Sequence, residues 1–174
     1  MRTSRRSATL LVPLSLPLAV SLSLTALTGP PAQAATTASE VLSHYYDSGL
    51  EIAPSADIVC APGGTAIEGT ATFGTEPGDL WTGTTSYDFC LYPTDTPDEY
   101  TYSGRETLTG SVTGCGTGSF TWIGTGHSMD GGVWRIVAGS GTGDLTGARG
   151  SGTSTATTTP ALENFGEFAG TFAC

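Results

Sequence analysis

Apolar and polar residues alternate with a period of two along much of this chain, and this alternation restricts its fold more than any other feature. In the segment Ile67–Phe73 the odd positions are small or apolar, and the even positions carry glutamate and threonine. The segments Trp81–Leu91 and Tyr100–Val112 place aromatic residues on one register in the same way. Such alternation is typical of strands with one buried face. No stretch after residue 40 shows a convincing helical period, so we expect an all-β protein.

The spacing of these segments predicts about eight strands. They are expected at Tyr45–Glu51, Ile67–Phe73, Trp81–Leu91, Tyr100–Val112, Phe120–Trp122, Val133–Ala138, Ala148–Thr157 and Gly166–Cys174. About eight antiparallel strands in one domain suggest a closed barrel or a two-sheet sandwich. The links between them are short, which favours up-and-down connections. We therefore expect a single antiparallel up-and-down β-barrel.

The chain has four cysteines, and we expect them to form two disulfides. An even number of cysteines is typical of exported proteins with disulfides, and the closest pair is about twenty-five residues apart, too far for a zinc motif. In a meander, successive loops alternate between the two ends of the barrel. Cys60 and Cys90 then share one end, and Cys115 and Cys174 share the other. Because bridged α-carbons lie within about 7 Å, we predict Cys60–Cys90 and Cys115–Cys174.

Residues 1–34 have the layout of a secretory signal peptide. A basic start precedes an apolar stretch from Leu10 to Leu27, and small residues at Ala32 and Ala34 form a cleavage signal. An uncleaved membrane anchor is the alternative, but two prolines interrupt the apolar stretch. We expect a secreted, extracellular protein whose residues 35–174 form the barrel domain. The export route, general secretory or twin-arginine, stays open.

The charge of the expected mature chain limits its partners. Three arginines stand against sixteen carboxylates, with no lysine anywhere, so the net charge is near −13. Nucleic acid and anionic membranes are therefore poor partners, because both need a basic surface. A small apolar ligand remains possible, and the oligomeric state is left open.

The stretch GSGTGDLTGARGSGT at residues 139–153 is rich in glycine without matching a nucleotide or calcium motif. A phosphate loop needs a lysine, and a dinucleotide fingerprint needs a third glycine where Asp144 stands. Calcium-binding nonapeptides need tandem copies. We interpret Gly139–Gly147 as a tight turn between two strands, where glycines permit positive φ angles. No cofactor is expected.

The same stretch resembles the signature of the allene oxide cyclase-like and dirigent-like barrels. The matching residues are Gly141-Thr142-Gly143, Leu145 and Ala148-Arg149-Gly150, and the run from Gly114 to Phe120 and the final Cys174 also fit. The chain looks most like a bacterial, secreted branch of this superfamily, over roughly Gly114–Cys174. The resemblance implies an eight-stranded antiparallel barrel with an apolar interior. Plant members cyclise a fatty-acid epoxide or orient phenoxy radicals.

Glu106 is the candidate catalytic residue. It lies on the apolar register of its strand, two positions from Leu108 and four from Tyr102. If that face lines a barrel, burial would raise the pKa of the carboxyl and make it a possible general acid or base. The alternative, which we favour because buried glutamates are rare, is a surface glutamate or one paired with Arg135 or Arg149.

Further candidate binding residues are aromatic or basic. Trp81, Trp122 and Trp134 share registers with apolar residues, so we expect them in the core or lining a cavity rather than as an exposed stacking platform. Arg149 could hold a carboxylate or a phenol-like oxygen at the barrel mouth. Its alternative role, which we favour, is to tie the glycine turn to neighbouring carbonyls or to Asp144.

Two other polar groups are expected to be ordinary surface features. His127 lies beside Asp130, but no serine or cysteine stands in a recognised nucleophile motif, so an exposed loop histidine is favoured. Asp95, Asp98 and Glu99 are spaced too irregularly for a calcium loop. We expect no metal.

Three functions follow from these patterns. The first is a secreted barrel that binds a small apolar or aromatic ligand through Tyr100, Tyr102, the three tryptophans and Arg149, without established catalysis. The second is a cyclase or isomerase of small lipophilic substrates that uses Glu106 with Tyr100 and Tyr102. The third is extracellular recognition of a polysaccharide or protein, which requires an exposed patch around the tryptophans.

Overall fold

A computed structural model describes residues 40–49, 52–128, 130–159 and 163–174. The expected signal segment, residues 1–34, lies outside the described residues. Within the described part of the chain, no helix is long and apolar enough to cross a membrane.

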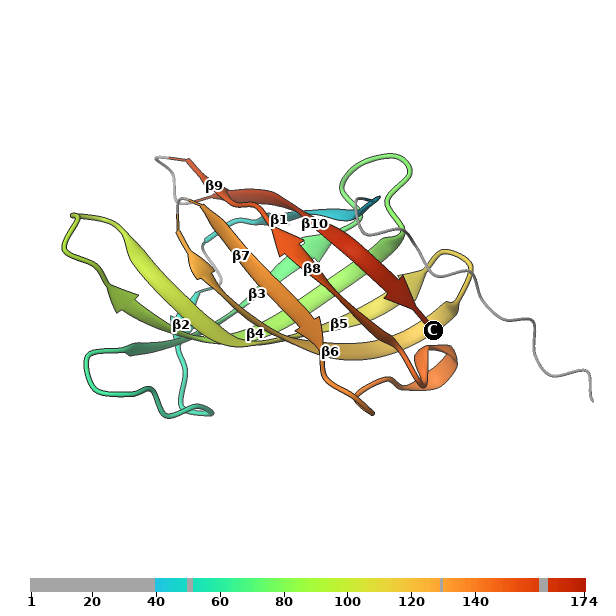
Figure 1. Cartoon of the computed structure of the whole chain (residues 1–174), viewed down its shortest axis with the longest axis horizontal. Coiled ribbons are helices and arrows are strands. Elements are labelled where there is room, and N and C mark those ends of the chain that lie inside the picture. Colours follow the sequence, from blue (N-terminus) through green and yellow to red (C-terminus); the bar gives the residue numbers. More distant parts are fainter. Residues whose placement is uncertain (1–39, 50–51, 129, 160–162) are drawn as a thin grey trace, which may run out of the picture. The chain divides into compact units, whose positions relative to one another are not determined.

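Eight long antiparallel strands form a closed barrel (Figure 1). Going round the barrel, they follow the order β1-β10-β8-β7-β6-β5-β4-β3, and pairing of β1 with β3 closes the ring. The strands are β1 (Glu40–Asp47), β3 (Thr65–Phe73), β4 (Trp81–Pro93), β5 (Tyr100–Val112), β6 (Gly116–His127), β7 (Gly131–Ile136), β8 (Arg149–Ser154) and β10 (Asn164–Ala173). Two short strands, β2 (Ala53–Pro54) and β9 (Thr157–Thr158), pair with β3 and β10. The predicted up-and-down barrel is confirmed.

Several expected strand boundaries were wrong. The strand expected at Tyr45–Glu51 begins and ends earlier, as β1, because Gly49 turns the chain with a φ of 69°. The strand expected at Phe120–Trp122 extends in both directions as β6, since its glycines interrupt the apolar pattern without interrupting the ladder. The strand expected at Ala148–Thr157 is divided between β8 and β9.

Aromatic side chains around Trp81 fill one half of the barrel interior. The Trp81 ring centroid lies 5.2 Å from that of Phe120, 5.3 Å from that of Trp134 and 5.5 Å from that of Phe172. All three pairs meet edge to face, the geometry that aromatic quadrupoles favour. Trp81 is fully buried. This packed half supplies the main hydrophobic core of the barrel.

The glycine-rich turn after β7 covers the packed half. It contains a short 3₁₀ turn, Gly143–Leu145, and the Leu145 side chain is fully buried in the core. Asp144 accepts a 3.0 Å hydrogen bond from the backbone N–H of Thr117 on β6. The structural role predicted for this stretch is confirmed. Arg149 is exposed and forms no ion pair within the described chain, so Asp144, one of the two partners expected for its structural role, was wrong.

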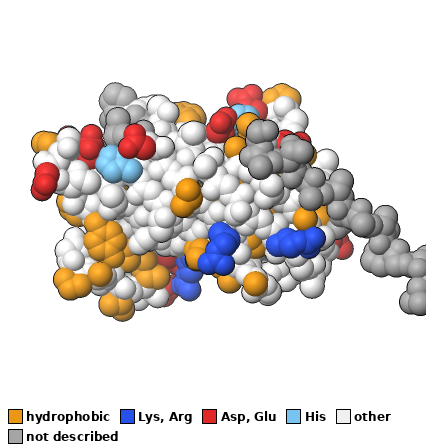
Figure 2. Space-filling model, viewed as in Figure 1, with side chains coloured by type: hydrophobic (Ala, Val, Ile, Leu, Met, Phe, Trp, Pro, Cys, Tyr) orange, Lys and Arg blue, Asp and Glu red, His pale blue; other side chains and the backbone are white. Residues whose placement is uncertain are grey.

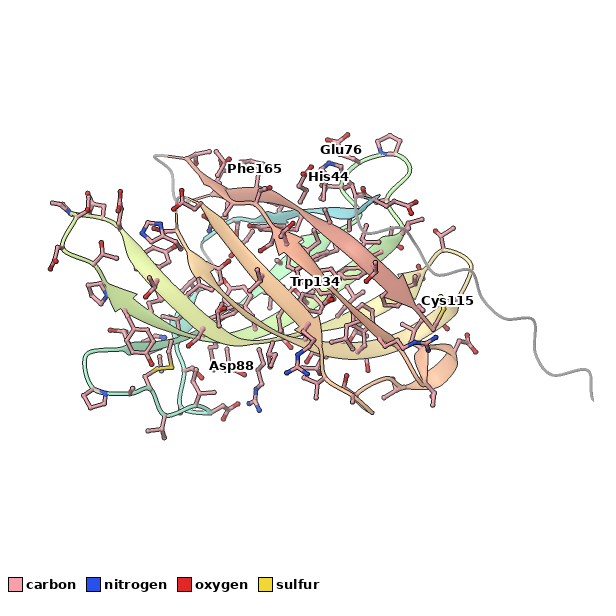
Figure 3. The ribbon with its side chains drawn as sticks, viewed as in Figure 1. His44, Glu76, Asp88, Cys115, Trp134 and Phe165 are labelled. Carbon is pink, nitrogen blue, oxygen red and sulfur yellow. A yellow bond between two sulfur atoms is a disulfide. The ribbon has the colours of Figure 1, made fainter. Side chains whose placement is uncertain are left out.

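Both predicted disulfides are confirmed. The α-carbons of Cys60 and Cys90 lie 5.5 Å apart, and those of Cys115 and Cys174 lie 6.1 Å apart. The second bridge joins the turn between β5 and β6 to the end of β10, near the labelled Cys115 in Figure 3. The two bridges therefore staple opposite ends of the barrel, as the meander requires.

Candidate functional site

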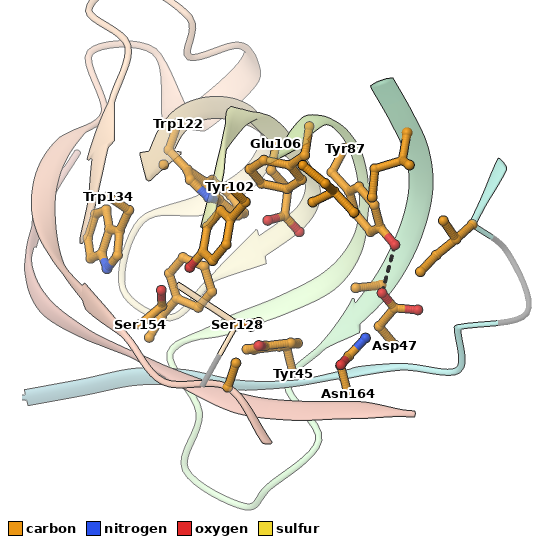
Figure 4. A pocket seen from close by; sticks show the side chains of 18 of the residues that line it. Tyr45, Asp47, Tyr87, Tyr102, Glu106, Trp122, Ser128, Trp134, Ser154 and Asn164 are labelled. Atoms are coloured by element: carbon orange, nitrogen blue, oxygen red, sulfur yellow. Dashed lines mark hydrogen bonds between the residues drawn. The ribbon is translucent and has the colours of Figure 1, made fainter. Parts of the chain in front are cut away.

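The half of the interior beyond the Trp81 core is open. It forms a cavity of about 140 Å³ toward the end where β4 passes into β5 (Figure 4). A dry cavity of roughly 150 Å³ accommodates one benzene molecule, so this space suits a single ring. The described residues that line it are mostly aromatic or apolar: Tyr45, Asp47, Ile52, Ile67, Ala71, Phe73, Tyr87, Phe89, Leu91, Tyr100, Tyr102, Glu106, Trp122, Gly124, Ser128, Val133, Trp134, Ser154, Ala156, Asn164 and Phe168.

Glycines on the wall of this half make room for the tyrosine rings. A Cβ atom at Gly69 would collide with the ring of Tyr87, and one at Gly126 or Gly132 would collide with the end of the Tyr102 side chain. Glycine in a strand interior often marks such a close approach. The glycines thus let bulky rings lie along the wall instead of across the cavity.

Glu106 projects from β5 into the cavity. Its neighbours across the sheet are Tyr87 on β4 and Trp122 on β6, and it is only 7% exposed. Burial raises the pKa of the Glu106 carboxyl to about 8; a hydrogen bond from Thr85 opposes this, and the charge of Asp47 adds to it. Glu106 therefore carries its proton at neutral pH.

The favoured alternative for Glu106, a surface or arginine-paired glutamate, was wrong. Successive residues of a strand point to opposite faces, so Arg105 points outward and pairs with Asp88, 3.3 Å away. Arg135 and Arg149 are also exposed. Figure 2 shows the basic side chains along one outer wall of the barrel. None of the arginines of the described barrel lines the cavity with Glu106.

Asp47, at the end of β1, is a second carboxyl in the cavity, and the sequence did not reveal it. It is 6% exposed, accepts a 2.7 Å hydrogen bond from the hydroxyl of Tyr87, and accepts a 2.8 Å bond from the N–H of Gly49. The available signal was its spacing of two from Tyr45, which puts both on the inner face of β1. Because the expected strand ran on to residue 51, Asp47 did not stand out at a strand end.

Four tyrosines supply hydroxyl groups around the cavity. Tyr100 and Tyr102, expected as site residues, line it together with Tyr45 and Tyr87. Burial raises the pKa of all four phenols above the usual value, and for Tyr87 the hydrogen bond to Asp47 adds to the effect. These hydroxyls therefore stay protonated and can donate hydrogen bonds.

Comparison with known proteins places this barrel in a family. A family model described as a protein of unknown function, DUF3224, matches residues 67–164, more than half of the chain. The chain belongs to the DUF3224 family. A crystal structure of a DUF3224 protein of unknown function from Shewanella oneidensis MR-1 is 19% identical, with a TM-score of 0.51, and the alignment covers 78% of this chain and 97% of that one. No curated protein matches the chain.

The DUF3224 match covers much of the cavity but not all of it. Glu106, Tyr87 and Tyr102 lie within the matched residues, whereas Asp47 on β1 and Phe168 on β10 lie outside them. The similarity to the solved structure concerns the fold alone. The chemistry of the site therefore depends on the residues of this DUF3224 chain.

Two of the residues expected to bind a ligand lie elsewhere in the DUF3224 barrel. Trp122 and Trp134 line the cavity, but Trp81 is enclosed in the aromatic core and does not reach it. Arg149 lies in an outer groove with Arg135, because the residue begins β8 on the outer register.

The histidine and acidic groups are also remote from the cavity lining. His127 is the last residue of β6, so its expected position in a loop was wrong. Its ring nitrogens lie 3.6 Å from carboxylate oxygens of Glu99 and Asp130, and it is not among the cavity residues. The one acidic cluster with metal-ligand geometry in the described chain is on the outer wall: Asp57, Glu68 and Asp88. Its member Asp88 already accepts from Ser55 and Arg105, so we assign no metal to it.

Proposed function

We propose that this DUF3224 protein is a secreted barrel that binds a small aromatic or apolar molecule in its open half. The observation that carries the proposal is the division of the interior. One half is packed by side chains, while the other leaves a cavity of about 140 Å³ lined by nine aromatic residues and two carboxyls. Ligand sites are commonly apolar concavities with a few polar groups that fix orientation.

The size of the cavity restricts the ligand to about one ring, with any substituent extending through the mouth. A ligand of one ring is much smaller than the fatty-acid epoxide on which plant cyclases act. The eight-stranded antiparallel barrel and its apolar interior support the resemblance to the allene oxide cyclase-like and dirigent-like barrels. Their activities belong to those plant proteins, and we propose only the common mode of binding inside the barrel.

Secretion is part of the proposal. Disulfides persist in oxidising compartments and are rare in the cytosol. The two disulfides of this barrel therefore support a non-cytoplasmic location. The layout of residues 1–34 supports cleavage and export, with residues 35–174 as the mature domain.

A second candidate is an isomerase or cyclase, and the position of Glu106 favours it. A carboxylic acid that keeps its proton at neutral pH inside an apolar cavity can donate that proton to a bound molecule and recover one from another atom of it. The exchange is balanced and needs no cofactor. Turnover in heavy water would introduce deuterium into a converted substrate, and Glu106→Gln would stop the incorporation.

Recognition of a polysaccharide or protein through exposed tryptophans is not proposed. Trp81, Trp122 and Trp134 are 0%, 1% and 3% exposed. A stacking platform needs an exposed ring face, which none of them offers.

Gly124 provides a direct test of the proposed binding. It lies on the cavity wall without a positive φ, and a Cβ placed there would meet only a backbone oxygen of Val133 at 3.6 Å. Gly124→Leu should therefore fill the cavity without straining the strand. Its control is Ile123→Leu, which changes the adjacent residue on the outer wall, where Ile123 is 42% exposed.

The measurement is calorimetric titration of the disulfide-bonded protein with single-ring probes such as toluene, indole and benzyl alcohol. We expect at least one probe to bind the wild type and Ile123→Leu equally, and Gly124→Leu not at all. Equal binding to Gly124→Leu would locate the probe outside the cavity and contradict the proposal.

A further inference from the structure

The cavity contains acidic groups but no basic ones. Among its described lining residues, Asp47 and Glu106 are the charged types, and lysine, arginine and histidine are missing. The sequence has no lysine, and its arginines within the described barrel are exposed. No side chain of the described wall can therefore neutralise the two carboxyls.

The two carboxyls differ in the hydrogen-bond donors that the protein offers them. Asp47 accepts from the Tyr87 hydroxyl with Oδ2 and from the Gly49 N–H with Oδ1. These two hydrogen bonds occupy acceptor positions on both oxygens of Asp47. Glu106 has the Thr85 hydroxyl as a hydrogen-bond partner. Further acceptor capacity on Glu106 thus remains for a bound molecule.

Aromatic rings surround these carboxyls. Tyr45, Tyr87, Tyr102 and Trp122 line the same space. In Figure 4 the rings of Tyr87, Tyr102 and Trp122 lie around Glu106. The faces of aromatic rings carry negative quadrupole potential and attract cations, most strongly where water is excluded.

We infer that the ligand of this cavity is a small organic cation, a primary or secondary amine in its ammonium form attached to about one ring. The inference rests on the proposed function and names its ligand class. The ring occupies the aromatic space, while the N–H groups donate to Glu106 and Asp47. A carboxylate ligand would meet two acidic groups without a counter-charge, and a neutral ligand would bring no positive charge to them.

Binding of an ammonium has a consequence for protons. The groups that face Glu106 are Asp47 from β1, Tyr45 from β1, Tyr87 from β4 and Tyr102 from β5. The three tyrosines stay protonated, because burial raises the pKa of each phenol. Burial raises the pKa of the Glu106 carboxyl to about 8, so this carboxyl is protonated at pH 7 and can release its proton when a cation enters.

The test compares benzylamine, benzyl alcohol and benzoate, which have similar shapes and different charges. Each is titrated calorimetrically into the disulfide-bonded protein at pH 7, in two buffers with different protonation enthalpies. We expect benzylamine to bind roughly tenfold or more tightly than benzyl alcohol, with release of close to one proton. Benzoate should bind most weakly.

Variants test whether the difference in affinity and the proton release arise in the cavity. Glu106→Gln should abolish proton release and bring the affinities of benzylamine and benzyl alcohol within a few-fold of one another. Glu68→Gln makes the same chemical change on the outer wall and should leave both quantities as in the wild type. Near-ultraviolet circular dichroism of each variant verifies that the aromatic core is intact.

The outcomes separate the inference from the proposed function. If benzyl alcohol binds the wild type as tightly as benzylamine, the ligand is neutral; the inference is overturned and the proposed function stands. Tight benzylamine binding that persists in Glu106→Gln with unchanged proton release also overturns the inference. If none of the three probes binds, the inference is overturned, and the proposed function fails with it only if toluene and indole do not bind either.

Discussion

The hydroxyl of Tyr87 on β4 donates a 2.7 Å hydrogen bond to Oδ2 of Asp47 on β1, across two strands that are not paired with each other. The strand β3 lies between them in the sheet. The bond therefore spans the interior beside the seam where β1 and β3 close the barrel. It fixes a carboxylate and a phenol at the edge of the open cavity.

Removing this hydroxyl should destabilise the protein. In Tyr87→Phe the Asp47 carboxylate, which is 6% exposed, loses one of its two donors. We expect the free energy of unfolding to fall by about 1–3 kcal/mol, measured by urea denaturation. The control is Tyr46→Phe, which removes a hydroxyl bonded to Glu163 at the surface, where water can replace it. Equal destabilisation by the two variants would show that the hydrogen bond to Asp47 contributes no more to stability than one at the surface.

The stability of the barrel should depend on pH through Glu106. Its pKa is raised from 4.5 to about 8 by burial. Below pH 4.5 the carboxyl is protonated in both states, and its contribution to stability is complete. Between pH 4.5 and 8 the unfolded chain loses this proton while the folded protein keeps it, so stability falls with rising pH, by about 5 kcal/mol at most.

Glu106→Gln should remove this fall. Comparison of the variant with the wild type at each pH isolates the contribution of Glu106 from that of other groups, such as Asp79. Burial of the Asp79 carboxyl opposes ionisation, but hydrogen bonds from His44 and from the Glu76 backbone outweigh it and lower its pKa. The contribution of Asp79 to stability is lost only as the pH falls through the acidic range, where its carboxyl becomes protonated. Parallel stability curves for wild type and Glu106→Gln would contradict the prediction.

Trp81 should be the most sensitive residue of the packed half. Its ring contacts six other aromatic rings, and its indole N–H has no hydrogen-bond partner within the described chain. We expect Trp81→Ala to cost at least about 3–5 kcal/mol. Trp81→Phe should cost less, about 1–3 kcal/mol, because it keeps a ring and removes an unsatisfied donor.

Urea denaturation followed by near-ultraviolet circular dichroism measures these costs. Val133→Ala is the control, because Val133 is 58% exposed, and it should change stability by less than about 0.5 kcal/mol. A Trp81→Ala protein as stable as the control would show that the core does not depend on this ring.

The two disulfides should contribute unequally. The Cys115–Cys174 bridge spans 59 residues and the Cys60–Cys90 bridge spans 30. By chain entropy their contributions are about 4 and about 3.5 kcal/mol. The first bridge also packs against the core and holds the end of β10. The double variant Cys115→Ser/Cys174→Ser should therefore melt at a lower temperature than Cys60→Ser/Cys90→Ser, and the opposite order would contradict this role.

Features that depend on local order were predictable from the sequence. Period-two alternation identified strands such as Tyr100–Val112, because the two faces of a strand follow directly from backbone geometry. Short links implied a meander, and the meander in turn implied both cysteine pairs. The glycine turn was also recognisable, since the absence of lysine excluded a phosphate loop.

The burial of Glu106 in the cavity could be predicted only in part from the sequence. Its register correctly suggested an inward side chain, but the rarity of buried carboxylates favoured an exterior position. Only the tertiary structure shows that every arginine of the described barrel lies outside the cavity and that Asp47 lies near Glu106.

The alternation of side chains along each strand thus determined the barrel class and the disulfide pairs, because these depend on strand number and connection length. The tertiary structure alone decided which half of the interior is filled. Trp81 and Leu145 occupy one half, while inward glycines such as Gly124 leave the other open. That division depends on the register between strands distant in sequence and on the closure of β1 against β3, and a period of two within one strand carries no information about either.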